Sequence, residues 1–332
     1  MLSSDFNLDF SDPKVSPFNL DTPLIPYKCG TKKDFKKNRP VKEVWVKHDD
    51  QLNGDLDLPP WAKMEGIRQV LLSDEILSED NIDGKKDVLY PKLSTDRPII
   101  HLSVRQSYSG WALAYIGREL GFDIKIAYPD TKDYPKNAIE KIKSLGAEPI
   151  PMKPNILSIV TSSVANLAKK ENYQMMPYAF DHPVYTQFFE DRMVHLLKEH
   201  SDKNFDHLVV NAGSGVTPSG LIRGFLKQDE EEKIFPPRSP KKIHIISTSS
   251  KRSTRKTLLK HNAYHICKVN IHESKFEFAD EMKKKKFETP FPCNENWDKK
   301  AWRWLQKNHC TLKGNVLFYN LGGECASKIW SK

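Results

Sequence analysis

A glycine-rich stretch between two apolar runs constrains the fold of this chain more than any other feature. Residues 211–221 read NAGSGVTPSGL; they follow the run LVV at 208–210 and lead into LIRGFL at 221–226. This pattern predicts a buried strand, a tight turn and a helix start, where backbone N–H groups gather at the positive end of the helix. Three glycines would let an anion approach the backbone, because they have no side chain to block it: Gly213, Gly215 and Gly220. An ordinary strand-to-helix connection explains the stretch equally well, since neither the Walker nor the dinucleotide spacing is present.

Short apolar runs alternate with helical patterns along most of the chain. Strands are predicted at 44–47, 98–102, 122–127, 148–152, 174–178, 207–211, 242–247 and 315–319. Helices are predicted at 61–72, 107–120, 138–145, 156–170, 185–200, from 218 onward and at 297–308. This alternation over short connections predicts an α/β fold with mostly parallel sheets. Residues 227–241, acidic and then proline-rich, are expected to form a surface insertion.

The composition limits the class of protein and its compartment. Apolar residues make up 38 % and charged residues 29 % of the 332 residues, which predicts a globular chain. No apolar run approaches bilayer length and the N-terminus has no leader pattern, so we expect a cytoplasmic protein without a membrane segment. The five cysteines are scattered and never form a Cys-x-x-Cys pair, so we expect neither a disulfide framework nor a metal site.

The net charge of +9 allows two interpretations. Clustered lysines and arginines are a possible footprint for the phosphate backbone of a nucleic acid. They are equally common on solvated faces that bind nothing, and no nucleic-acid-binding motif accompanies them. The clusters are Lys32, Lys33, Lys36, Lys37 and Arg39; Arg238, Lys241 and Lys242; Lys251, Arg252, Arg255 and Lys256; and Lys283 to Lys286.

Several motifs follow one another in an order that resembles a known enzyme family. VWVKHDD at 44–50 is followed by PPWAK at 59–63, RQSYS at 105–109 and the loop GSGVT at 213–217; NWDKKA at 296–301 and LFYNLGG at 317–323 close the series. This order resembles the fold-type II pyridoxal-phosphate enzymes (tryptophan synthase β-like). Within them it is most similar to the branch of aminocyclopropane-carboxylate deaminase and D-cysteine desulfhydrase. The resemblance covers roughly residues 22–330.

The resemblance implies a role for each matching residue. Lys63 would be the Schiff-base lysine, Ser107 would bind the substrate carboxylate, and Tyr108 stands where the family contacts the ring hydroxyl of the cofactor. Trp297 stands in place of a tyrosine with acid–base or substrate duties, and Asp298 in place of the glutamate beside the pyridine nitrogen. The phosphate of pyridoxal 5'-phosphate would be held by Gly213, Ser214, Gly215, Val216 and Thr217, with Leu321 near the ring.

Some of these residues depart from the family pattern, and each has a structural alternative. Trp61-Ala62 replaces Gly-Asn before the lysine, Glu65 replaces an arginine, and Leu321 replaces a threonine. Without a cofactor, Lys63 would be one exposed lysine among many, and Ser107 a helix N-cap. Trp297 would be core packing, and Asp298 would complement the helix dipole.

Three functions are compatible with these residues. The first is a pyridoxal-phosphate enzyme that acts on the amino group of an amino acid or a similar substrate, by elimination, deamination, decarboxylation or replacement at Cα or Cβ. The second is such an enzyme acting on an amino-acid-modified base in DNA, as in phage-type thymidine hypermodification, which would use the basic clusters. The third is a non-catalytic binding protein on the same fold.

The resemblance also implies an architecture of two three-layer α/β domains with the cofactor between them. A large discontinuous domain would comprise residues 23–65 and 185–332, and a small inserted domain would comprise residues 66–184. Residues 1–22 would be a flexible arm, and the protein would be a homodimer.

Overall fold

The computed structural model describes residues 22–37, 41–50, 58–73, 77–79, 88–90, 92–104, 107–232, 240, 242–264, 268–274 and 289–322. The expected N-terminal arm (apart from Thr22), Gln106, residues 233–239 of the expected insertion and the cluster Lys283 to Lys286 lie outside these residues.

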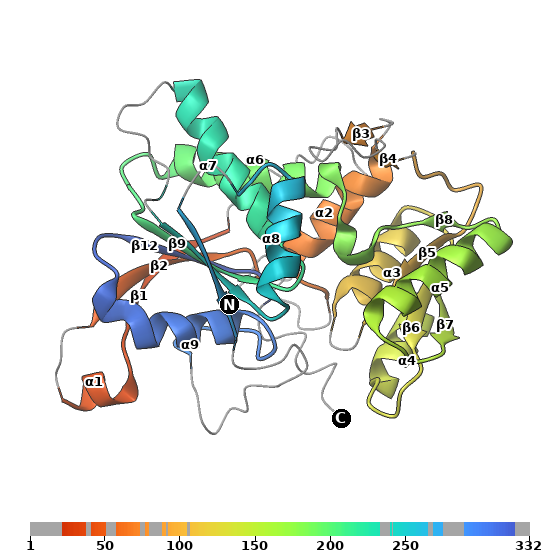
Figure 1. Cartoon of the computed structure of the whole chain (residues 1–332), viewed down its shortest axis with the longest axis horizontal. Coiled ribbons are helices and arrows are strands. Elements are labelled where there is room, and N and C mark those ends of the chain that lie inside the picture. The colour runs from red at the N-terminus through yellow and green to blue at the C-terminus, as the bar shows by residue number, and fades with distance from the viewer. Residues whose placement is uncertain are drawn as a thin grey trace, which may run out of the picture.

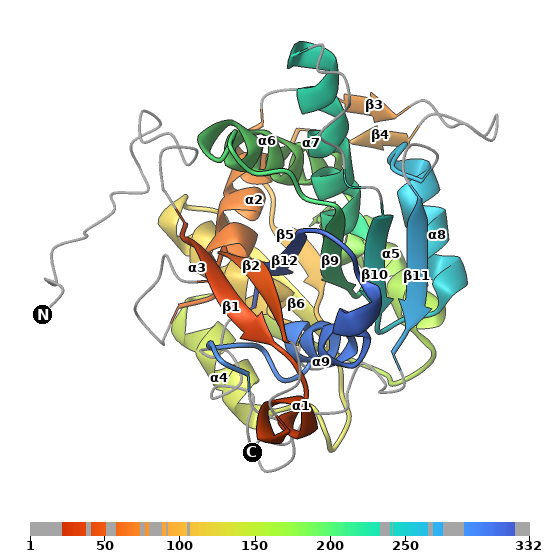
Figure 2. The ribbon, with the colours of Figure 1, turned by 90° about the vertical axis from the view of Figure 1, so that its left-hand side faces the viewer.

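The larger of the two main sheets has six strands in the order β1-β2-β12-β9-β10-β11. Strands β9 and β12 at its centre are buried along their whole length, which explains their apolar sequences. Every described pair is parallel except β1 with β2, and β1 and β11 form the opposite edges (Figure 2). The strands are Leu24–Cys29 (β1), Lys42–His48 (β2), His207–Ala212 (β9), Lys242–Ser247 (β10), Val269–Glu273 (β11) and Val316–Asn320 (β12).

Helices cover both faces of this sheet, as Figure 1 shows. Helices α6 (Pro183–Glu199) and α7 (Val216–Glu232) lie on one face, with α8 (Lys251–Lys260) beside them. Helix α9 (Asp298–Asn308), which ends in the 3₁₀ turn η4 (His309–Thr311), covers the other face. Trp302 and Leu305 of α9 pack there against the buried side chains of β2, β9 and β12.

The smaller sheet has four parallel strands in the order β7-β6-β5-β8. They are Ile99–Leu102 (β5), Ile124–Pro129 (β6), Glu148–Met152 (β7) and Gln174–Met175 (β8). Helices α3 (Ser109–Glu119) and α4 (Lys136–Ser144) pack on one face, and α5 (Leu157–Lys170) packs on the other. The prediction of an α/β fold with mostly parallel sheets is therefore confirmed.

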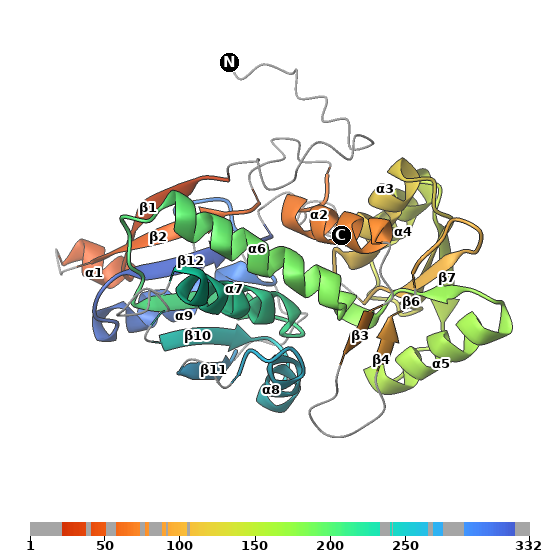
Figure 3. The same cartoon turned by 90° about the horizontal axis from the view of Figure 1, so that it is seen from above.

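The chain passes between the two sheets by two segments, seen from above in Figure 3. Helix α2 (Trp61–Leu72) leads out, packing against both α3 and α6. The 3₁₀ turn η2 (Tyr178–Phe180) leads back into α6. In it Ala179 and Phe180 have φ angles of 58° and 54°, a left-handed conformation that few residues other than glycine adopt. A two-stranded ribbon, β3 (Leu77–Glu79) with β4 (Val88–Tyr90), follows α2.

Two glycines bring α7 into close contact with α6. A Cβ on Gly220 would lie 2.4 Å from the carbonyl oxygen of Thr186, and one on Gly224 would lie 2.4 Å from that of Glu190. The expectation that Gly220 makes room for an anion is therefore wrong, because it faces the neighbouring helix. Gly220 lies within α7, beyond the loop, and the helix directs its α-carbon toward α6.

A buried ion pair fastens α6 to the sheet. Arg192 Nη2 lies 3.0 Å from Asp49 Oδ1, and both side chains are fully buried. The same carboxylate accepts hydrogen bonds from Thr22 Oγ1 and from the hydroxyl of Tyr319. On its other side the Arg192 guanidinium lies 4.8 Å from the ring centroid of Trp61, at the start of α2.

Several elements were not predicted from the sequence. These are β1, the short helix α1 (Lys32–Lys36), β3, β4, α8 and β11. Helix α7 begins at Val216 rather than 218 and continues to Glu232, so the expected insertion at 227–241 starts within a helix. No helix among the described residues is both long and apolar enough to span a bilayer.

Candidate active site

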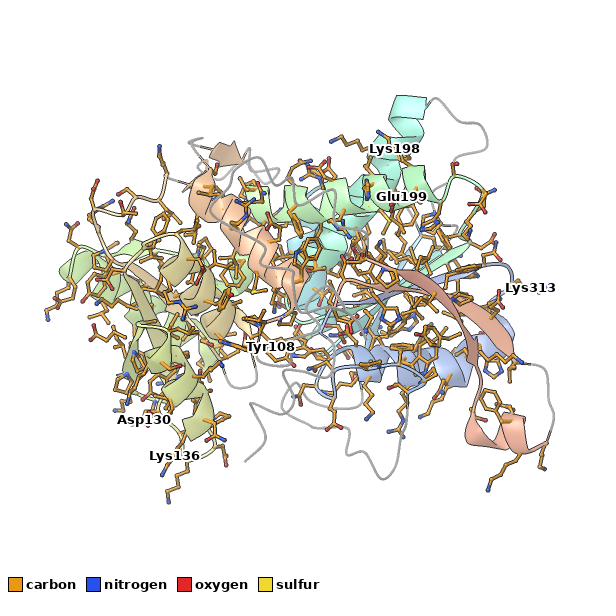
Figure 4. All side chains as sticks on the ribbon, turned by 180° about the vertical axis from the view of Figure 1, so that it is seen from behind. Tyr108, Asp130, Lys136, Lys198, Glu199 and Lys313 are labelled. Carbon is orange, nitrogen blue, oxygen red and sulfur yellow. The ribbon has the colours of Figure 1, made fainter. Side chains whose placement is uncertain are left out.

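A cavity of about 370 Å³ lies where the two sheets and α2 meet. Figure 4 shows Tyr108, one of its lining residues, at the middle of the molecule between the two sheets. Of the site residues predicted from the sequence, all but one line it: Lys63, Ser107, Tyr108, Gly213, Ser214, Gly215, Thr217, Trp297, Asp298 and Leu321. The exception is Val216, whose side chain is buried in the core, so only its backbone is available to a ligand.

Lys63 enters the cavity from the first turn of α2. Its Nζ lies 5.7 Å from the ring centroid of Tyr108 and 5.6 Å from that of Trp297. The surrounding protein removes water from the ammonium and lowers the pKa of Lys63 to about 8, although the Asp298 carboxylate acts in the opposite direction. About a tenth of the amine is then neutral at pH 7, far more than for an ordinary lysine. A neutral amine is the form that attacks a carbonyl carbon.

The glycine loop lies at the carboxyl end of β9 and opens α7. Gly215 has a φ of 102°, which only glycine adopts readily, and a Cβ there would lie 3.2 Å from the carbonyl oxygen of Thr254. A Cβ on Gly213 would lie 2.5 Å from the ring of Trp297. The loop is therefore folded back against α8 on one side and against Trp297 on the other, with the positive end of α7 facing the cavity.

Asp298 is the first residue of α9 and is held by the turn that follows β12. Its Oδ2 accepts the backbone N–H of Gly322 at 2.7 Å and that of Leu321 at 3.3 Å. Burial raises the pKa of Asp298 to about 7, against the lowering effect of these hydrogen bonds. A carboxyl group with this pKa can share a proton with a basic nitrogen placed beside it.

Ser107 lies on the opposite wall, at the start of α3. Its Oγ donates to Ser109 Oγ at 2.8 Å and accepts the backbone N–H of Ser109 at 3.2 Å. The residue that directly precedes α3 is Tyr108, so Ser107 closes the turn before the helix rather than capping it. Trp297 packs against the core, as one of its two interpretations predicts, and it also lines the cavity, where its expected role toward a substrate stays a prediction.

Some lining residues were not found from the sequence. Thr248 and Ser249 follow β10, which is parallel to β9, so their hydroxyls reach the same edge as the glycine loop. The predicted strand at 242–247 was sufficient to place them there, because the carboxyl ends of neighbouring parallel strands share one edge. No pattern in the sequence indicated that the cavity is also lined by Leu157 of α5 and by aromatic residues of η2 and α6.

The residues around the cavity fit pyridoxal phosphate. Backbone N–H groups at the start of α7 and the hydroxyls of Ser214, Thr217 and Ser249 are donors of the kind that bind a phosphate, whereas the hydroxyl of Thr248 donates to the carbonyl oxygen of Ala212. Asp298 offers a carboxyl group to a ring nitrogen, and Lys63 an amine to an aldehyde. Among the described residues, the Lys63 amine has no hydrogen-bond or ion-pair partner that would hold it away from this task.

Comparisons with known proteins agree with this fit. Residues 106–286 match the model of the family "Pyridoxal-phosphate dependent enzyme". The chain is 26 % identical over 233 residues to the glycyl-dTMP PLP-dependent decarboxylase of Pseudomonas phage M6, covering 67 % of this chain and 80 % of that protein.

Solved structures share the fold at low sequence identity. A homologue of ACC deaminase has a TM-score of 0.65 at 17 % identity, with 96 % of this chain and 94 % of that one covered. Threonine deaminase isoform 2 from Solanum lycopersicum has a TM-score of 0.61 at 14 % identity, with 95 % and 85 % covered. Diaminopropionate ammonia lyase from Escherichia coli has a TM-score of 0.60 at 15 % identity, with 96 % and 88 % covered. With its family model matched over more than half of its length, this chain belongs to the pyridoxal-phosphate dependent enzymes.

Proposed function

We propose that this protein is a pyridoxal-phosphate-dependent decarboxylase whose substrate is an amino-acid group carried on a thymine nucleotide. The observation that carries the proposal is the aromatic lining of the cavity around Lys63. Six aromatic side chains face it: Tyr108, Tyr178, Phe180, Tyr185, Phe189 and Trp297. A carboxylate placed against these rings is poorly solvated, and its loss as neutral CO₂ relieves that cost.

The reaction replaces one bond at Cα by another. The carboxylate leaves as CO₂, its bonding electron pair remains on Cα, and a proton is added there. Pyridoxal phosphate, when bound, supplies the electron sink for that pair. Lys63 would hold the cofactor and carry the proton, which suits an amine with a pKa of about 8. Asp298 would keep a proton at the ring nitrogen, and the glycine loop would hold the phosphate.

The exposed apolar residues at the mouth of the cavity favour a substrate larger than a free amino acid. Leu157 lines the cavity and is still 44 % exposed. Its neighbours Ile156, which directly precedes α5, and Ile159, in the first turn of α5, are 66 % and 46 % exposed. An apolar rim of this kind suits the flat face of a pyrimidine base. The phage relative, a glycyl-dTMP PLP-dependent decarboxylase, supports the same substrate class.

Incubation with pyridoxal phosphate and thymidine monophosphate bearing a glycyl group tests the proposal. Mass spectrometry is expected to show a product lighter by one CO₂. Release of ammonia without CO₂ would contradict decarboxylation. Turnover of free amino acids, with none of the nucleotide, would contradict the nucleotide substrate.

Leu157→Ala is expected to raise KM for the modified nucleotide about tenfold with little change in kcat, because it removes apolar contact with the base and leaves the reacting atoms untouched. Steady-state kinetics on the nucleotide measures both constants. Leu72→Ala is the matched control, since Leu72 is 45 % exposed and does not line the cavity. An equal rise in KM for both variants would show that Leu157 does not contact the base.

A further inference from the structure

A second hollow, of about 700 Å³, lies between α8 and the edge strand β11. We call it the α8–β11 groove. Four cationic residues of α8 line one side: Lys251, Arg252, Arg255 and Lys256. The other side comes from Tyr264 and from Val269 to His272. The Arg255 guanidinium lies 4.7 Å from the ring centroid of Tyr264, which fixes its place in the groove.

The four cations share one face because they follow helical spacing. Positions 251 and 255, and 252 and 256, are one turn apart, and all four side chains are exposed. Thr254 and Leu258, on the opposite face, are buried against the protein. An ordinary solvated helix face carries charges of both signs. This face differs, because no acidic residue lies between positions 251 and 260.

These charges are not neutralised by the described part of the protein. None of the four forms an ion pair with a described residue, whereas Lys260 at the end of the same helix lies 2.9 Å from Asp181. The nearby Glu273 accepts the backbone N–H of Lys251 at 2.9 Å. Four cations that have no ion pair among the described residues, with the single carboxylate of Glu273 nearby, favour an anionic ligand with several charges.

The groove and the candidate active site share α8. Thr248 and Ser249 line the cavity, Ser250 caps the helix by accepting the N–H of Ser253 at 3.1 Å, and Lys251 follows directly. The inner face of α8 touches the glycine loop at Gly215. Because Ser249 lines the cavity and Lys251 lies only two residues further along the chain, an anion that follows the outer face of α8 from Lys251 onward starts beside the cavity.

We propose that the α8–β11 groove binds the phosphate backbone of a DNA strand that carries the modified thymine. This inference rests on the proposed function and extends it, because it makes the substrate a polymer rather than a free nucleotide. Arginine and lysine on one helix face can contact successive phosphates, and the release of counterions drives such binding. The groove would hold the strand while one base reaches into the cavity.

The test compares Arg252→Ala/Lys256→Ala with wild type and with the control Lys136→Ala/Lys143→Ala. The control lysines are exposed on α4, which lies away from α8 in all three ribbon views. Fluorescence anisotropy with a labelled oligothymidylate is measured from about 50 to 200 mM salt. The groove variant is expected to bind about tenfold more weakly, and its slope of log Kd against log salt is expected to fall by about 1.4 for two lost phosphate contacts. The control should match wild type.

Turnover gives the second readout. Wild type is expected to act on the modified thymine with a higher kcat/KM in an oligonucleotide than in the mononucleotide, and the groove variant should lose only that preference. Equal binding of the oligonucleotide by the groove variant and wild type would overturn the inference, as would equally tight binding of polyglutamate. Absence of turnover on both substrates, with binding still lost in the variant, would contradict the proposed function and leave the DNA-binding groove supported.

Discussion

Lys63→Ala protein, supplied with pyridoxal phosphate, is expected to show no near-visible absorbance band from a lysine-linked cofactor and a kcat lower by at least about 10³-fold. The loss has two physical causes. The amine that would bond to the cofactor is removed, and so is the only amine that the described lining offers for proton transfer at Cα. Absorbance spectra and single-turnover rates measure the two effects separately.

A matched control for this variant is Lys169→Ala, in the last turn of α5, where the lysine is exposed and outside the cavity. It should keep the band and the rate of wild type. An absorbance band that persists in Lys63→Ala would contradict the assignment of Lys63 as the residue that bonds to the cofactor. A wild-type protein with no band after addition of the cofactor would favour a binding protein without catalytic activity.

Asp49→Ala is expected to lower the free energy of unfolding by about 3–5 kcal/mol, because a buried ion pair that loses one partner leaves a poorly solvated charge. Arg192 would lose the carboxylate 3.0 Å from its guanidinium, and Tyr319 the acceptor for its hydroxyl. Urea unfolding followed by fluorescence measures the change. Asp202→Ala, which removes an exposed ion pair with Lys203, should leave the unfolding midpoint unchanged.

The same carboxylate predicts a pH dependence. Burial acts to raise the pKa of Asp49, but Arg192, Lys47 and the hydrogen bonds to its oxygens outweigh burial, so the pKa is lower in the folded protein than in the unfolded chain. The folded state then binds fewer protons, and this contribution to stability is present at neutral pH and lost as the pH falls below the usual aspartate value. Wild type should therefore lose stability in acid more steeply than Asp49→Ala. Equal slopes of unfolding free energy against pH for the two proteins would show that the acid sensitivity does not come from Asp49.

The site was predicted from two kinds of information. The glycine loop follows its strand directly, so a short window predicts the strand, the turn and the helix start, whereas the role of Lys63 was implied by the order of motifs that resembles the family. Gly220 shows the limit of this reasoning: its residue type suggested ligand access, but the helix turns it toward Thr186. Which way a residue faces depends on the partner helix, and that partner is distant in sequence.

Other features depend on tertiary contacts alone. Strand β1 contains Pro26 and forms an edge, so its pattern is weak until β2 pairs with it. The left-handed backbone at Ala179 and Phe180 could not be predicted, because neither residue is a glycine. It forms where the chain turns from the four-stranded sheet into α6. The stacking of Arg192 on Trp61 joins residues more than a hundred positions apart. No local pattern contains such information.

The two walls of the cavity come from separate segments of the chain. The glycine loop and Asp298 belong to the six-stranded sheet and its helices, whereas Ser107 and Leu157 belong to one uninterrupted stretch that builds the four-stranded sheet. Substitutions of Ser107 or Leu157 therefore change the side of the cavity that lies across from the glycine loop and Asp298. The larger substrate that we propose would then depend on side chains of this one segment, while Lys63, the glycine loop and Asp298 lie outside it.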